Sequence, residues 1–179
     1  MIPSPIPDSH PEDAGQSAFH MARCEVVAGA VLRAARTSAR ITEACLAAAS
    51  AVSEDTVRAW ENGSEPLTAE PAPRLEQLKH VLMDAGAEPG VAADLDAGVW
   101  CDLIILAIAG ADDCACLAAD PLTCENAFRE LLAWSLTGQV PARYRRYVSA
   151  GPLITDPALT VQITAVLGSI RPDLFHHPA

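Results

Sequence analysis

The sequence predicts an all-α protein. Half of its 179 residues are apolar, alanine is the dominant type and aromatic residues make up only 4%, a composition that favours closely packed helices over a β-sandwich. Apolar residues recur at helical spacing in several stretches, and no stretch alternates between apolar and polar residues as a half-buried strand does. A chain of this length forms one domain of ordinary size or two small ones.

Charge is distributed unevenly along the chain. The net charge is −11, from 12 basic and 23 acidic residues. Residues 1–22 hold three acids and no Lys or Arg, residues 23–83 hold seven basic and eight acidic residues, and residues 84–179 hold five basic and twelve acidic residues. Net negative charge opposes non-specific binding to nucleic acid and to anionic membranes. We therefore expect only the middle segment to meet a polyanion.

The chain shows no signal peptide and no membrane span. Residues 1–18 contain several prolines but neither a basic region nor an apolar core, so we expect a disordered tail. The longest apolar run, residues 99–110, is interrupted by Asp102 and is too short and too charged to cross a bilayer. These features predict a cytoplasmic protein without membrane contact.

Two short helices with a tight turn between them are expected in the first half. A first helix is predicted over residues 19–39, with one apolar stripe of Val27, Val31 and Leu32. Thr42 then precedes a short Ala-rich helix, and Ser53 precedes another that ends at Gly63. Two short helices separated by three or four residues are typical of a helix-turn-helix.

Four further helices are expected in the remainder of the chain, at residues 74–86, 94–109, 123–138 and 156–168. The second of these is apolar beyond a single stripe, so we expect it to be buried on most sides. Its predicted main stripe consists of Leu95, Val99, Leu103 and Leu106, and the residues that widen it are Trp100, Ile104, Ile105 and Ile108.

Residues 31–82 resemble one known family. Leu46-Ala47 matches the end of its second helix, and the third helix ends in Trp60, Glu61, Asn62 and Gly63. These residues resemble the XRE-type, lambda-repressor-like helix-turn-helix regulators. Ala51 stands where that family prefers glycine, at a cost of about 1 kcal/mol if the turn is left-handed. The resemblance implies an ion pair between Arg36 and Glu61 under the third helix.

The resemblance implies a fold and a function. The fold is a lambda-repressor-like helix-turn-helix domain over residues 19–86, followed by a second small helical domain over residues 91–175. The function is sequence-specific binding of a double-stranded DNA operator, with the helix at 53–62 in the major groove. The acidic second domain is expected to form a homodimer, and Trp100 and Trp134 offer either core packing or a small-molecule effector pocket.

Residues around the two short helices are the expected DNA contacts. In the family, bases are contacted from positions that fall here on Glu54, Asp55 and Ala59, and phosphate from the position of Glu43. The full predicted contact set is Arg40, Thr42, Glu43, Ser53, Glu54, Asp55, Thr56, Arg58, Ala59 and Asn62, with Arg33 and Arg74 near the same surface.

The acids at the start of the third helix have two interpretations. Glu54 or Asp55 could accept a hydrogen bond from the cytosine amino group. Both also stabilise a helix start by about 0.3–1 kcal/mol each, without any ligand. These acids, together with the net charge of −11, keep an alternative function open: a protein–protein interaction module, such as a partner regulator or an antitoxin, with weak or no DNA binding. The salt dependence of binding would distinguish the two.

Other motifs are weaker. Residues 140–148 interleave arginines with tyrosines, which suits either single-stranded nucleic acid or ion pairs within or between subunits, and we favour the ion pairs. Cys114, Cys116 and Cys124 suggest a metal or redox cluster but lack a C-x-x-C pair and a nearby histidine, so ordinary reduced cysteines are expected. No catalytic, nucleotide-binding or metalloprotease motif occurs. We expect no enzyme activity, no cofactor and no metal.

Overall fold

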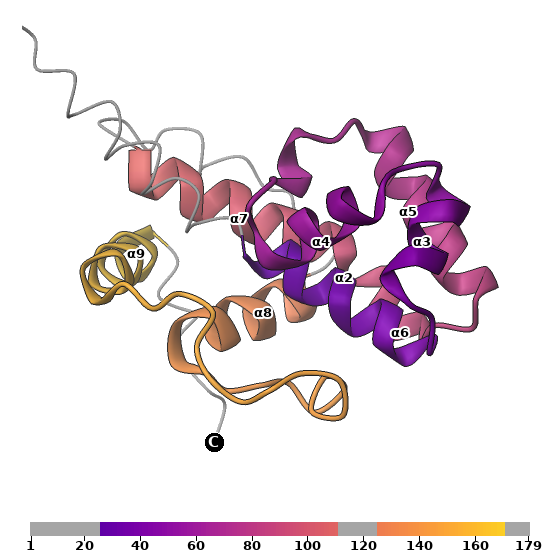
Figure 1. Ribbon diagram of the computed structural model, residues 1–179. Helices are drawn as coiled ribbons and strands as arrows, with labels where there is room; N and C mark the ends of the chain where they lie inside the picture. The colour runs from indigo at the N-terminus through magenta and orange to yellow at the C-terminus, as the bar shows by residue number, and fades with distance from the viewer. Residues whose placement is uncertain (1–25, 111–124, 171–179) are drawn as a thin grey trace, which may run out of the picture.

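Helices supply the regular secondary structure of residues 26–110 and 125–170, the parts of the chain that the computed structural model describes. These residues contain no strand, so the predicted all-α class is confirmed for them. The expected tail at residues 1–18 lies outside the described residues. The elements are α2 (Val27–Ser38), α3 (Glu43–Ser50), α4 (Glu54–Asn62), a 3-10 turn η1 (Leu67–Ala69), α5 (Ala72–Asp84), α6 (Pro89–Ala93), α7 (Leu95–Gly110), α8 (Glu125–Thr137) and α9 (Pro157–Ile170) (Figure 1).

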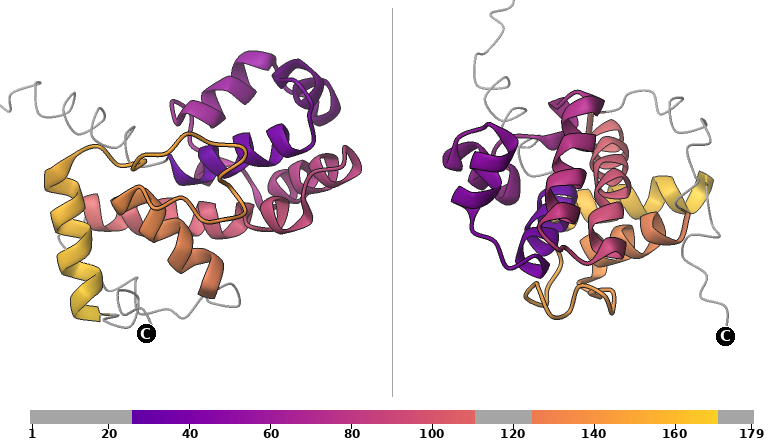
Figure 2. Two further views of the ribbon diagram at one scale, coloured as in Figure 1. Left: turned by 90° about the horizontal axis from the view of Figure 1, so that it is seen from below. Right: turned by 90° about the vertical axis from the view of Figure 1, so that its right-hand side faces the viewer.

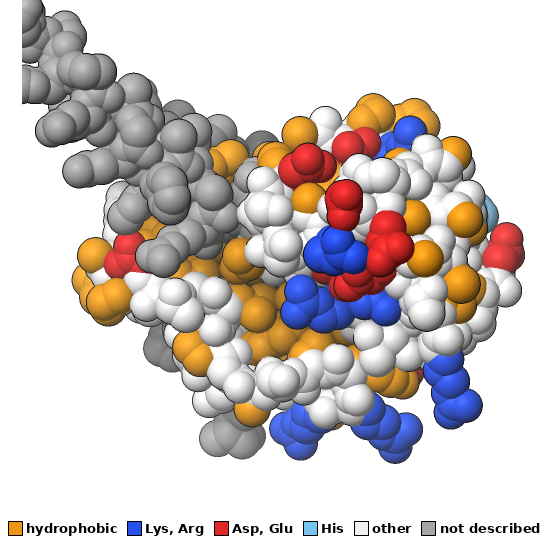
Figure 3. Space-filling view, in the orientation of Figure 1, with side chains coloured by type: hydrophobic (Ala, Val, Ile, Leu, Met, Phe, Trp, Pro, Cys, Tyr) orange, Lys and Arg blue, Asp and Glu red, His pale blue; other side chains and the backbone are white. Residues whose placement is uncertain are grey.

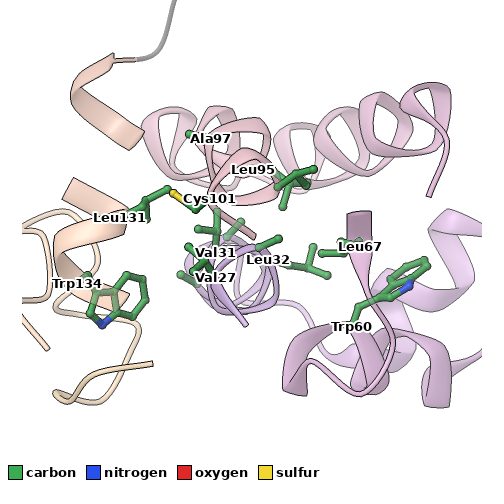
Figure 4. Packing of buried hydrophobic residues seen from close by; sticks show 14 of the residues in the cluster. Val27, Val31, Leu32, Trp60, Leu67, Leu95, Ala97, Cys101, Leu131 and Trp134 are labelled. Carbon is green, nitrogen blue, oxygen red and sulfur yellow. The ribbon is translucent and has the colours of Figure 1, made fainter. Parts of the chain in front are cut away.

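Helix α2 lies at the centre of the packing. It contacts α4 on one side and α7 on the other, and Figure 4 shows its side chains between those of the two neighbours. Val27, Val31 and Leu32 form the predicted stripe and are fully buried. Trp60 of α4 and Cys101 of α7 are buried on either side of them.

Two glycines allow the helices to approach α2 closely. A Cβ atom on Gly29 would lie 2.2 Å from the carbonyl oxygen of Trp60, so α2 and α4 meet at backbone distance there. A Cβ atom on Gly98 of α7 would lie 3.0 Å from Cα of Ala28. Any larger residue at Gly29 forces the two helices apart, because the atom it meets belongs to the backbone.

The start of α2 is capped by a side chain from α7. Val26, at the N-cap position, makes no side-chain cap bond. Instead the carboxylate of Asp102 accepts hydrogen bonds from the backbone N–H groups of Val27 and Ala28, both at 2.9 Å. Asp102 is 1% exposed. A buried carboxylate therefore satisfies two of the N–H groups that a helix start leaves unpaired.

The buried face of α7 differs from the predicted stripe. Leu95 and Val99 are buried as expected, but Leu103 is 37% exposed and Trp100 is 46% exposed. Helix α7 packs against α2, α8 and α9, and its other buried residues are Ala97, Gly98, Cys101, Asp102, Ile105 and Ile108. The stripe was misplaced because every face of α7 is apolar, which leaves the periodicity without a preferred direction.

No helix in the described part of the chain is long and apolar enough to span a membrane.

Helices α8 and α9 also pack on α7. Figure 2 shows α9 lying across the far end of α7, with α8 beside it. Gly138 follows α8 with φ 77° and Asp156 caps α9 through Ala158 N–H at 2.9 Å, as expected. Gly168 was predicted to end α9 but lies inside it, because the helix continues to Ile170. A Cβ atom at Gly168 would meet nothing within 4 Å.

The two parts of the chain share one hydrophobic core. Its buried members run from Val27 in α2 to Leu167 in α9 without a break between residues 26–86 and the later helices. The stretch after Gly86 forms the short helix α6, whose Val91 and Ala92 are fully buried. The sequence did not predict α6, because Pro89 and Gly90 are typical of a linker.

Candidate nucleic-acid interface

The turn between α3 and α4 sets the angle between the two helices. Ala51 adopts the left-handed conformation, with φ 55° and ψ 44°, and the N–H of Val52 bonds back to Ala47 at 3.0 Å. Ser53 then caps α4 by accepting the N–H of Thr56 at 2.9 Å. Gly63 ends α4 with φ 74°. The left-handed turn inferred from the family is therefore present, and it contains alanine.

One face of α4 is buried and holds the helix against α2. Val57 and Trp60 are buried in the core, and Glu61 is 5% exposed. Because these residues lie three and four apart, they occupy one side of the helix. The opposite side exposes Glu54, Asp55 and Arg58, among others.

Arg36 and Glu61 form a bidentate ion pair under α4. The Nε and Nη2 atoms of Arg36 donate to the two carboxylate oxygens of Glu61 at 2.6 and 2.8 Å, and Nη1 donates to the carbonyl of Ile41 at 3.0 Å. The hydrogen bond with Glu61 raises the pKa of Arg36 above its usual value. Arg33 adds a bond from Nη2 to the backbone carbonyl of Glu61 at 2.9 Å. The geometry matches the planar fork that arginine presents to a carboxylate.

Three carboxylates surround Arg58 on the exposed side of α4. Its Nη1 contacts Asp55 at 2.7 Å, its Nη2 contacts Glu54 at 2.8 Å and its Nε lies 3.2 Å from a carboxylate oxygen of Glu43 in α3. We call Arg58, Glu43, Glu54 and Asp55 the α4 charge cluster. Acidic and basic side chains gather over α4 in Figure 3. Because one guanidinium meets three carboxylates, this surface is acidic, and the charge of Glu43 is the main cause of the raised pKa of Arg58.

The remaining predicted contact residues lie at the ends of the same helices. Thr42 caps α3 by accepting the N–H of Cys45 at 3.1 Å, and the hydroxyls of Ser53 and Thr56 bond to each other at 2.8 Å. Asn62 accepts the N–H of Ser64 at 2.8 Å. Ala59 is half-buried on α4. These polar side chains stabilise helix ends and still lie beside the exposed surface of α4.

Arg40 and Arg74, both predicted near the DNA-binding surface, differ in their contacts with the rest of the protein. Arg40 follows α2, is exposed and has a φ of 58°. Arg74 of α5 donates to the backbone carbonyl of Ser50 at 2.9 Å and so fixes the end of α3. Arg74 is therefore part of the scaffold, whereas Arg40 presents its charge to solvent.

Residues 140–148 form turns that ion pairs and hydrogen bonds hold against the helices. Arg143 pairs with Asp94 at 2.5 Å and with Glu130, and the hydroxyl of Tyr144 donates to Asp94 at 2.7 Å. Tyr144 is fully buried, and burial raises its pKa. Tyr147 donates to Glu88 at 2.9 Å. The predicted ion pairing within the chain is confirmed for Arg143.

Neither Trp100 nor Trp134 lines the hollow that the described residues form. Trp134 is buried, with its ring centroid 5.4 Å from that of Tyr144, whereas Trp100 lies at the surface. An open hollow of about 380 Å³ lies at the 140–148 turns, between residues that include Gly138, Val140 and Arg145. Its single charged residue is Arg145, so the hollow does not gather the convergent polar groups of a typical small-molecule site.

Cysteines and possible metal ligands are dispersed in the described residues. Cys45 is exposed at the start of α3, where its hydrogen bond with Thr42 lowers its pKa, and Cys101 is buried. No group of three His, Cys, Asp or Glu side chains that could hold a metal occurs within residues 26–110 and 125–170. Cys114, Cys116 and Cys124 lie outside the described residues.

Comparisons with protein-family models, with curated proteins and with solved structures find no match to this chain. Only the residues of the chain and their geometry therefore bear on its function.

Proposed function

We propose that the chain is a sequence-specific DNA-binding transcriptional regulator of the helix-turn-helix type, which inserts α4 into the major groove of an operator as a dimer. One observation carries the proposal. Helix α4 is joined to α3 by a left-handed turn, and the Arg36–Glu61 pair holds its buried face against α2. The opposite face of α4 is exposed. This is the arrangement that a recognition helix requires.

The α4 charge cluster determines how such a helix would contact bases. Arg58 can donate two hydrogen bonds to guanine, and a carboxylate can accept from the amino group of cytosine. In the free protein these groups satisfy one another, because Arg58 contacts Glu54 and Asp55 on the same helix. Binding therefore exchanges ion pairs within the protein for contacts with bases. Specificity follows from the fact that only a matching sequence replaces the lost bonds.

A dimer is part of this proposal, because one helix contacts only a short half-site. Two copies would place their α4 helices about 34–36 Å apart, or at a multiple of that distance. The exposed apolar side chains Trp100 and Leu103 of α7 are a surface that association would cover.

The α4 charge cluster also favours a second candidate function. Three carboxylates around one arginine leave an acidic surface, and duplex DNA repels such a surface. A protein partner with a basic surface would instead find complementary charge there. In this second candidate the helix-turn-helix is a scaffold for protein–protein interaction.

Selection of bound duplexes from a random pool, at low and at physiological salt, tests the proposal. We expect an enriched motif with two related half-sites. Arg58→Ala should weaken binding to that motif by about tenfold or more, because it removes a base contact worth about 1–3 kcal/mol, and Glu54→Ala should change the preferred base at one position. Glu76→Ala is the matched control, since it removes an exposed carboxylate from α5 rather than from α4.

The outcomes separate the two functions. If no sequence is enriched even at low salt, while all variants keep the wild-type circular dichroism spectrum and melting temperature, sequence-specific regulation is excluded. Binding of a basic protein partner that is weakened by Glu54→Ala would then establish the interaction module.

A further inference from the structure

A group of exposed arginines lies where the end of α2 meets the 140–148 turns. Its members are Arg40, Arg145 and Arg146, which we call the arginine rim. In Figure 3 basic side chains project from the lower edge of the face that presents α4, beside the loop between α8 and α9. The rim joins a residue of the helix-turn-helix half to two residues of the acidic half.

Contacts between their sequence neighbours bring Arg40 and Arg146 to the same part of the surface. Ser38, two residues before Arg40, accepts the backbone N–H of Glu88 at 3.0 Å. The carboxylate of Glu88 accepts the hydroxyl of Tyr147, the neighbour of Arg146, at 2.9 Å. The hydrogen bond with Glu88 raises the pKa of the Tyr147 hydroxyl, and the charges of Arg146 and Arg40 act on the same hydroxyl and oppose that rise.

The backbone that carries Arg145 and Arg146 is fixed by contacts of neighbouring residues with the helices. Arg143 is fastened to Asp94 and Glu130, and Tyr144 is fully buried with its hydroxyl on Asp94. Arg145 donates from Nε to the carbonyl of Val140 at 3.3 Å, which leaves its other donors directed to solvent. The backbone that carries Arg145 and Arg146 is thus ordered before an anion binds, so that binding has to order only the side chains.

Charge in the rim is not neutralised by the rest of the described chain. Arg36, Arg58 and Arg143 bind carboxylates, whereas no ion pair joins Arg40, Arg145 or Arg146 to another described residue. Glu88 is the carboxylate between them, and it accepts from Tyr147. The rim therefore carries three arginines without an ion pair to a described residue, in a protein whose net charge is −11. A polyanion that approaches this protein meets attraction here and repulsion over most of the remainder.

From these contacts we propose that the arginine rim binds the phosphate backbone of duplex DNA beside the site that α4 occupies. This inference rests on the proposed function for the position of the DNA. Arg40 lies two residues before Thr42, which caps α3, the helix whose start faces the backbone in that function. Guanidinium groups match phosphate with paired hydrogen bonds. The acidic half of the chain thus contributes to DNA affinity, while the sequence preference comes from α4.

Salt-dependent binding to mixed-sequence duplex DNA tests the rim. The variants are Arg145→Ala/Arg146→Ala and the charge-preserving Arg145→Lys/Arg146→Lys, each checked for an unchanged thermal transition. Fluorescence anisotropy should show that the Ala variant binds about tenfold more weakly at low salt. The slope of log K against log salt should fall by about 2, because each lost phosphate contact removes about 0.9 from it. The Lys variant should keep the wild-type slope.

The same variants carried through selection from a random pool separate this inference from the proposed function. Enrichment of a motif together with an unchanged salt slope in the Ala variant overturns the rim and leaves the regulator in place. A reduced slope without any enriched motif supports the rim and overturns sequence-specific regulation. If the wild-type protein binds no duplex at low salt, both are overturned.

Discussion

The carboxylate of Glu61 is almost completely buried. Its side chain is 1% exposed and is held by Arg36 through two hydrogen bonds. Taking a carboxylate out of water costs several kcal/mol, and the guanidinium offsets that cost only while both partners are present. Stability at this position therefore depends on the pair rather than on either residue.

Removal of Arg36 should consequently destabilise the protein strongly. Arg36→Ala leaves the Glu61 carboxylate buried with only Arg33 nearby, at 3.4 Å, and should lower the free energy of unfolding by about 3 kcal/mol. Urea denaturation measures the change. Arg33→Ala is the control and should cost less than about 1 kcal/mol, because the Arg33 side chain is 50% exposed. Equal losses in the two variants would contradict the assignment of Arg36 as the main partner.

The sequence predicts the contacts of some residues and not those of others. The contact between Arg36 and Glu61 could be anticipated because a family resemblance pairs those two positions. The cap that Asp102 provides for α2 could not, because the partners are 74 and 75 residues apart in the chain. An aspartate inside an apolar run indicates only that the run is not a membrane span. What it binds depends on how α7 crosses α2.

Helix boundaries with a local cause were predictable. Thr42, Ser53 and Gly63 act on backbone groups within a few residues of themselves, so their effect is independent of the rest of the fold. Gly168 was misleading because a glycine ends a helix only where the backbone turns left-handed, and packing of Ile163 and Leu167 carries α9 beyond it. The exposed face of α7 was similarly decided by its neighbours rather than by its own sequence.

The crossing of α2 and α4 makes Gly29 sensitive to substitution. Gly29→Ala places a Cβ atom 2.2 Å from the Trp60 carbonyl oxygen, and the backbone there cannot move without shifting α4. We expect a loss of about 3 kcal/mol or more, since overpacking of this kind costs about 1–3 kcal/mol even where side chains can relax. The midpoint of thermal unfolding would report it.

Gly90→Ala provides the matched control for that substitution. Gly90 lies in helix α6, and a Cβ atom there meets nothing within 4 Å. Alanine should raise stability by up to about 1 kcal/mol, because it reduces the entropy that glycine loses on entering a helix. A destabilised Gly90→Ala together with a neutral Gly29→Ala would contradict the helix crossing described for α2.

In the molecule as a whole, the buried side chains of the described residues form a single cluster from α2 to α9, which continues across the boundary predicted between residues 86 and 91. Composition and charge change between the two halves, and such changes are what sequence analysis detects. The packing that joins them includes Gly98, which approaches Ala28 closely, and Asp102, which caps α2. Their significance arises only from the path of α7 across α2.

Association of two copies should depend on the exposed face of α7. Trp100 is 46% exposed and Leu103 is 37% exposed, one turn apart on the same helix face. We expect Trp100→Ser to weaken the proposed dimer by about tenfold or more, because a buried tryptophan is typically among the side chains that dominate an interface. Sedimentation equilibrium measures the dissociation constant.

Val161→Ser is the control for that measurement, since Val161 is 69% exposed and belongs to α9 rather than to α7. It should leave the dissociation constant unchanged. A wild-type protein that remains monomeric at all concentrations, or a dimer that responds to Val161→Ser but not to Trp100→Ser, would contradict a contact through α7.

The two hydrogen bonds from Asp102 to the start of α2 also bear on protein engineering. Chimeric proteins are often made by fusing the DNA-binding domain of one protein to the ligand-binding domain of another. Here residues 26–86, taken alone, would keep α4 but lose the carboxylate that satisfies Val27 and Ala28, together with the surface of α7 that covers α2. A chimera that preserves the packing of α2 must therefore retain α7, with the junction placed after Gly110 rather than at Gly86.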